Sequence, residues 1–187
     1  MMNHDAKRYV EEALIESGLN YTILQPSHLC ETFPLAKMLA DETPEYPICW
    51  NPATKFSFAS TKDVGEAAAN VLNEREKHYW ATYQLVSTPA PISYNDVVDI
   101  VSEAIGKKIR MRRRPFEEAI DDGLKLILKT AEVPFAYKEA GQRMFMYYND
   151  RGLVGNNNVL EMLLGHKPMD YKTWVGVKMK EIQEQQK

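Results

Sequence analysis

The sequence contains few of the residues that define disulfide-rich or metal-binding proteins. Cys30 and Cys49 are its two cysteines in 187 residues, and they form neither a CxxC pair nor part of a metal-binding cluster. This usage argues against a disulfide framework and favours a reducing compartment. No His, Asp or Glu grouping has the spacing of a metal site either. We therefore expect a cytoplasmic protein without a bound metal.

Long apolar runs and an excess of charge are also missing. No run approaches the ~20 residues that span a bilayer. The 23 basic and 26 acidic residues leave a net charge of −3, which attracts neither nucleic acid nor an anionic membrane. The one basic run, Arg110–Arg114, is more typical of a solvated edge strand than of a nucleic-acid site. We expect neither nucleic acid nor a membrane as a partner.

The nine glycines are dispersed along the chain. None of them belongs to a glycine-rich strand-to-helix turn, where backbone amides could approach a pyrophosphate. Gly152 and Gly155 form only a GxxG, with no β-forming run before it. The sequence therefore predicts no cofactor bound by this chain alone.

The first half of the sequence alternates between helical and extended patterns. A helix is predicted from near Asp5 to Gly18, and a strand over Tyr21–Gln25 that lacks alternation and so expects cover on both faces. The apolar positions of this helix, at helical spacing, are Ala6, Tyr9, Val10, Ala13 and Leu14. Residues 27–54 read as irregular, apart from a brief helix over Leu35–Leu39.

Two serines mark the next helix starts. Ser60 and Ser93 are each followed by an aspartate three residues later, as in a capping box, and a strand over Tyr83–Ser87 lies between the two helices. Beyond residue 107 the pattern is a short extended segment and then mostly helices, of which the first is opened by Pro115 and broken by Pro134. This order predicts an α/β fold in a single domain, residues 1–187.

Several strings carry a family resemblance. The most specific is Ser17-Gly-Leu-Asn-Tyr-Thr-Ile-Leu-Gln-Pro26; the others are His4-Asp-Ala-Lys7, Phe58-Ala-Ser-Thr-Lys-Asp63 and the segment 155–165. In this order and spacing they resemble the second half of NmrA-like proteins, which are atypical short-chain dehydrogenases that include reductases and redox-sensing regulators.

The resemblance implies the substrate-side half of such a protein, without the N-terminal dinucleotide-binding half. The expected fold is a truncated Rossmann-like α/β fold: a small, mostly parallel sheet of three to four strands, flanking helices and a helical C-terminal part. Residues 1–106 would be the remnant of the Rossmann second half, and residues 107–187 a mainly helical lid region.

The resemblance also places Lys7 at the position of the family's active-site lysine. Four residues earlier stands Asn3, where a YxxxK motif needs a tyrosine as proton donor. Two interpretations of Lys7 stay open: an acid–base group, or a solvated helix lysine paired with Glu11. For His4, one turn earlier, a frayed terminal residue is favoured over a proton shuttle.

Polar residues follow the predicted strand Tyr21–Gln25. Ligands of open α/β sheets gather at the carboxyl ends of the strands, so Gln25, Ser27 and His28 are expected to point into a crevice. His28 is the strongest candidate for a general acid or base. The competing interpretation is a loop histidine that caps the segment 29–40.

Aromatic residues downstream could line an apolar substrate pocket, although such stripes more often form plain core. The candidate wall consists of Phe33, Met38, Trp50, Phe56 and Phe58. Met144, Tyr147 and Tyr148 could close the pocket.

These features favour a redox-independent enzyme that binds a small organic substrate and acts as an isomerase, cyclase or lyase through His28, Lys7 and Gln25. Two alternatives stay open: a non-catalytic NmrA-like regulatory or partner-binding module, and the truncated or split half of an NAD(P)-dependent oxidoreductase. Without the first half, one edge of Tyr21–Gln25 would be bare, which predicts a homodimer or a partner chain at that edge.

Overall fold

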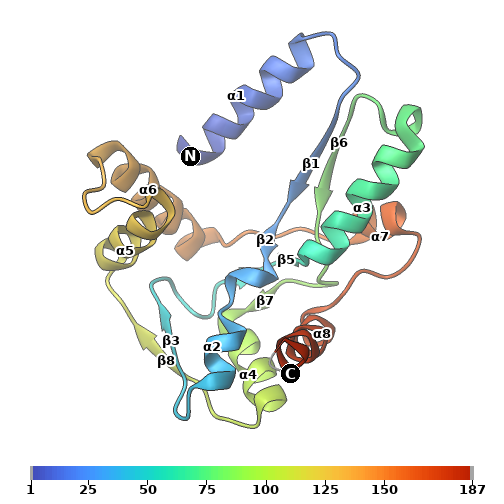
Figure 1. Ribbon diagram of the computed structural model, residues 1–187. Helices are drawn as coiled ribbons and strands as arrows, with labels where there is room; N and C mark the ends of the chain where they lie inside the picture. The colour runs from blue at the N-terminus through green and yellow to red at the C-terminus, as the bar shows by residue number, and fades with distance from the viewer. Residues whose placement is uncertain (1, 186–187) are drawn as a thin grey trace.

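The computed structural model describes residues 2–185, without the side chains of residues 2, 3, 126 and 127. It confirms an α/β fold (Figure 1). The helices are α1 (Met2–Glu16), α2 (Leu35–Ala40), α3 (Thr61–Glu74), α4 (Tyr94–Ile105), α5 (Phe116–Leu128), α6 (Phe135–Arg151), α7 (Asn158–Leu164) and α8 (Tyr171–Glu184). The strands are β1 (Thr22–Pro26), β2 (His28–Leu29), β3 (Glu45–Ile48), β4 (Lys55–Phe56), β5 (Phe58–Ala59), β6 (Ala81–Leu85), β7 (Ile92–Ser93) and β8 (Arg110–Arg113).

The described strands pair two by two. β1–β6, β2–β5 and β3–β8 are parallel, whereas β4–β7 is antiparallel. The mostly parallel character is as expected, but the strands form four short pairs instead of one sheet of three to four strands. The longest pair is β1–β6, in which Thr22 lies opposite Ala81 and Pro26 opposite Leu85.

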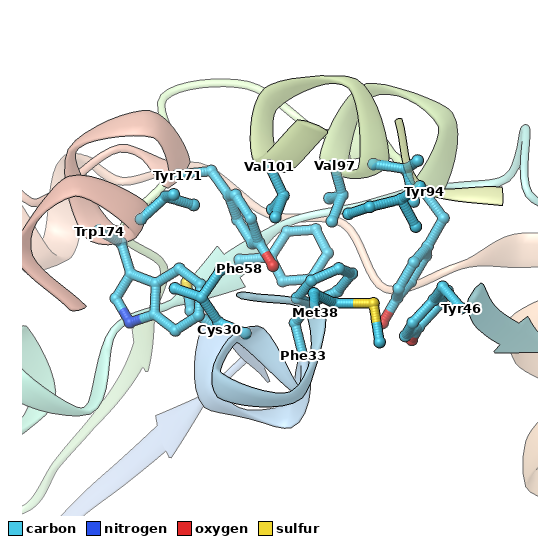
Figure 2. Close-up of a cluster of buried hydrophobic side chains, with 14 of the residues drawn as sticks. Cys30, Phe33, Met38, Tyr46, Phe58, Tyr94, Val97, Val101, Tyr171 and Trp174 are labelled. Atoms are coloured by element: carbon cyan, nitrogen blue, oxygen red, sulfur yellow. The ribbon is translucent and has the colours of Figure 1, made fainter. Parts of the chain in front are cut away.

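The main core lies where α2, α4 and α8 converge on the short strands. Figure 2 shows side chains from these elements interlocking around Phe58, Met38 and Tyr94, each at most 2% exposed. A second core joins α3 and α7 to β6 around Leu85 and Leu160. By contrast, none of the residues of α6 is buried.

The two predicted helix caps differ in detail. Ser93 and Asp96 form a complete capping box at the start of α4. Ser60 also caps α3, but it accepts from the amide of Lys62. The carboxylate of Asp63 instead accepts from the amide of Met169 at 2.9 Å and so ties α3 to the segment before α8.

One expectation about the first 54 residues is wrong. The strand β3 lies in the stretch expected to be irregular, because Pro44 and Pro47 obscured its extended pattern. The apolar positions 6, 9, 10 and 13 of α1, moreover, are exposed. Val10 is 65% exposed and Tyr9 59%, because nothing among the described residues covers that side.

The basic run forms a solvated edge strand, in agreement with the expectation. Among the described residues β8 pairs only with β3, and three of its four residues are exposed, while arginines of the run bind acceptors within this chain. Arg110 is ion-paired to Glu45, and Arg114 binds Asp122 at 2.6 Å.

Gly152 ends α6 in a conformation that requires glycine. Its φ of 64° and ψ of −154° lie in a region essentially reserved for glycine, and a Cβ there would meet the Lys55 carbonyl oxygen at 1.9 Å. We predict that Gly152→Ala lowers the free energy of unfolding by about 2 kcal/mol or more, measured by urea titration. Gly65→Ala, on the open side of α3, is the matched control and should change stability by less than about 1 kcal/mol.

Candidate functional site

A cleft of ≈ 920 Å³ lies at the carboxyl ends of β1 and β6. Its size is within the range of small-molecule sites. The N-terminal part of α1 forms one wall, and the segment 153–155 also contributes to the lining. The lining residues are His4, Asp5, Lys7, Arg8, Glu11, Leu24, Gln25, Pro26, Ser27, Gln84, Val86, Leu153, Val154 and Gly155.

The wall formed by α1 is polar. Positions 4, 7, 8 and 11 share one face because a helix turns once every 3.6 residues. Glu11 accepts two hydrogen bonds from the Gln25 amide, at 2.9 and 3.0 Å, and thereby fixes α1 over the end of β1. Lys7 forms no ion pair with any residue in the range 2–185, so the interpretation of Lys7 as the partner of Glu11 is wrong. Lys7 is the free cation of this wall, since Arg8 is held by Glu12 at 2.5 Å.

Serine hydroxyls hold the floor of the cleft in place. Ser27 donates to the Ser57 carbonyl at 2.7 Å. Ser57 in turn donates to the carbonyl of Gly155 at 2.9 Å and accepts from its amide at 3.0 Å. A Cβ at Gly155 would lie 3.0 Å from the side chain of Val86, so the close approach of this loop favours glycine.

His4 has a more specific environment than a frayed terminal residue. Its Nε2 lies 3.3 Å from the hydroxyl of Tyr148 on α6. Burial is the largest of the effects on His4 and lowers its pKa. Burial also raises the pKa of Tyr148. At neutral pH the pair is therefore a neutral imidazole and a phenol, and His4 lines the cleft. The sequence shows the spacing of His4 and Lys7, but it does not show the contact of His4 with Tyr148, which lies 144 residues away.

His28 lies in the core beside the cleft and does not line it. Its Nε2 is hydrogen-bonded to the hydroxyl of Tyr94 at 2.7 Å. Burial lowers the pKa of His28 to about 4. The rings around it belong to Trp50, Phe56, Phe58 and Tyr94. Its position corrects the expectation of a crevice histidine, since the chain turns inward after Ser27 to form β2.

The residues expected to bind substrate also lie outside the cleft. Phe33, Phe56 and Phe58 are at most 3% exposed and belong to the main core, as does Met38. Trp50 and Tyr148 pack on this core from its rim, where α6 approaches: Trp50 contacts Phe145, and Tyr148 contacts Phe56. Tyr147 is 41% exposed, and Met144 lies on the same helix, partly exposed.

The described residues do not fit the pyrophosphate of a dinucleotide. No glycine stands in any strand-to-helix turn between residues 2 and 185. At the start of α3, which follows β5 directly, the amide of Thr61 already donates to Glu31 and that of Lys62 to Ser60. An anion would have to displace a carboxylate of the protein there.

Within residues 2–185, none of the helices is long and apolar enough to cross a membrane. No group of three or more His, Cys, Asp and Glu side chains among these residues could hold a metal ion.

The parallel strand pairs, their flanking helices and a cleft at the carboxyl ends of β1 and β6 define a Rossmann-like α/β protein. The sequence model of the NmrA-like family matches residues 1–184, so the chain belongs to this family. Prestalk A differentiation protein A of Dictyostelium discoideum is 31% identical over 104 residues, which are 54% of this chain and 33% of that protein.

Solved structures share the fold. The match to the NADPH-dependent quinone oxidoreductase QOR2 of Escherichia coli has a TM-score of 0.71 and 20% identity, and it covers 94% of this chain and 61% of that chain. The Citrobacter sp. triphenylmethane reductase, complexed with NADP(H), has a TM-score of 0.64 and 23% identity, covering 89% and 56%. The chain thus spans less than two thirds of each of these relatives.

The desolvation of His28 by the aromatic rings around it predicts an acid-sensitive fold. Protonation of His28 favours the unfolded chain, in which its pKa is near 6.5, so stability falls as the pH drops below that value. Between pH 7 and pH 5 the loss attributable to His28 should be about 2 kcal/mol by urea titration. His28→Gln should remove that part of the loss.

The matched control is His166→Gln. His166 is exposed, and its hydrogen bond to Glu66 raises its pKa, so its removal should make the loss on acidification slightly larger. An unchanged pH dependence in His28→Gln would contradict the assignment of His28 to the core.

Proposed function

We propose that this chain forms the substrate-binding side of an NAD(P)-dependent oxidoreductase of the NmrA-like family. The observation that carries the proposal is the cleft at the carboxyl ends of β1 and β6, with the polar face of α1 as its wall. Membership of the family supports it, as do the NADPH-dependent quinone oxidoreductase and the NADP(H)-bound reductase that share the fold.

A redox role is better supported than the redox-independent isomerase, cyclase or lyase that the sequence favoured. That interpretation rested on the absence of a glycine-rich turn. The relatives contain additional chain that this sequence does not cover. A glycine-rich turn that binds the nucleotide would have to lie in that additional chain. The nucleotide is accordingly assigned to another α/β unit, and the present residues to the substrate. The regulatory module stays a prediction.

The side chains of the cleft would bind and orient a carbonyl or quinone oxygen. The ammonium group of Lys7 is free to stabilise negative charge that develops on such an oxygen. His4, held by the hydroxyl of Tyr148, can accept or deliver a proton one helical turn away. Glu11 and Gln25 position this wall through their mutual hydrogen bonds and are not needed as reacting groups.

A chimera tests this function. It joins the part of E. coli QOR2 that this chain does not match to residues 1–187. We expect the chimera to bind NADPH and to oxidise it when 1,4-benzoquinone is added. Lys7→Met should lower the quinone-dependent rate at least tenfold, because the cation at the oxygen is lost, and should leave NADPH binding unchanged.

The matched control is Lys180→Met, at an exposed position of α8 away from the cleft. It should retain the rate of the parent chimera. A chimera that binds NADPH, shows a cooperative unfolding transition and still reduces no quinone would contradict the proposed function.

A further inference from the structure

The backbone of the connection between α6 and α7, residues 152–157, is fixed on both sides of Val154 (Figure 1). On one side, the carbonyl of Leu153 accepts a hydrogen bond from the amide of Ser57 at 2.7 Å. On the other side, the amide and carbonyl of Gly155 both bind the hydroxyl of Ser57, at 3.0 and 2.9 Å. Ser57 itself is fully buried. The backbone at Val154 therefore has little freedom to move.

The side chain of Val154 belongs to the cleft. Its neighbour Leu153 packs against the main core, whereas Val154 lines the cleft and remains 61% exposed. A valine is branched at Cβ, so its side chain has few rotamers as well. A group that is already ordered loses little conformational entropy when a ligand packs against it. Val154 is thus an apolar contact that is ready for a ligand before the ligand arrives.

The lining of the cleft has a polar part and an apolar part. The charged groups come from α1, and the apolar groups come from other segments. A ligand that satisfies both parts has a polar oxygen for the charged groups and an apolar body for the rest. Aromatic carbonyl compounds have this form, whereas small aliphatic carbonyl compounds lack the apolar body. The apolar lining residues are Leu24, Pro26, Val86, Leu153 and Val154.

We propose that Val154 is the specificity-determining residue of the cleft, and that it selects aromatic carbonyl compounds, quinones included, by packing against their ring. This inference rests on the proposed function and names its substrate class. Val154 contacts the ring and not the reacting oxygen, so the contact is the same in the ground state and in the transition state. Such a contact lowers KM and leaves kcat unchanged.

The first test needs no nucleotide. The full chain of 187 residues is titrated with 2-naphthol, an aromatic alcohol, and the methyl groups are followed by NMR. The methyl signals of Val154 should shift and reach saturation. Val154→Thr keeps the shape of the side chain but replaces a methyl group by a hydroxyl, and it should raise the dissociation constant about threefold or more. Val154→Asp should raise it about tenfold or more.

The second test uses the chimera with QOR2 described above. Val154→Thr and Val154→Asp should raise the KM for 1,4-naphthoquinone by the same factors and leave kcat unchanged. With diacetyl, an aliphatic dicarbonyl compound without a ring, both variants should keep the KM of the parent chimera.

Val10 provides the matched controls. It is a valine of similar exposure, 65%, that does not line the cleft. Val10→Thr and Val10→Asp should behave like the parent in both tests. Because Val10 and Val154 are both exposed, all four variants should keep the circular dichroism spectrum of the parent chain.

The outcomes separate the inference from the proposed function. An active chimera whose KM for 1,4-naphthoquinone is unchanged by Val154→Asp would overturn the role of Val154 and leave the function standing. Binding of 2-naphthol that depends on Val154, together with an inactive chimera, would do the reverse. Val154 signals that do not respond to 2-naphthol, or a kcat that falls with both substrates, would also overturn the role of Val154.

Discussion

The parallel pairing of β1 with β6 is the constraint on which the site depends. It brings the carboxyl ends of both strands to one edge, and the bond from the Ser27 amide to the Leu85 carbonyl extends the pair by one step. From there the chain turns inward to β2, which separates two chemically different places. Ser27 remains at the polar floor of the cleft, whereas His28, one residue later, enters the aromatic core.

A helix whose charged face points inward and whose apolar face points outward depends on contacts with the rest of the protein for its stability. The inward face of α1 is held by the hydrogen bonds of Glu11 with Gln25 and of His4 with Tyr148. Both are individually modest, because each exchanges bonds with water for bonds within the protein. The position of α1 is therefore easily changed. Any element that packs against the exposed side chain of Val10 can shift α1 and so alter the shape of the cleft.

Local chemistry made much of the fold predictable from sequence. Serine caps, glycine stops and short β-forming runs located both long strands to within two residues and the first helix to within three, because these signals act on neighbouring residues. The cleft was predicted only in part. Lys7, Gln25 and Ser27 line it as expected, whereas His28 does not, because the inward turn depends on the contact of β2 with β5. The importance of His4 depends on Tyr148, and no local pattern could show it.

The attachment of α6 has a consequence for how this family diversifies. Its last turn is fixed by the hydrogen bonds of Asn149 with Asn51 and Thr54 and by the close approach at Gly152, and Phe145 and Tyr148 contact the rim of the main core. None of its residues is buried, so the side chains that face away from the core can be exchanged with little penalty to folding. Because the last turn of α6 stays fixed, a few substitutions along this helix can change the substrate preference while the fold is retained.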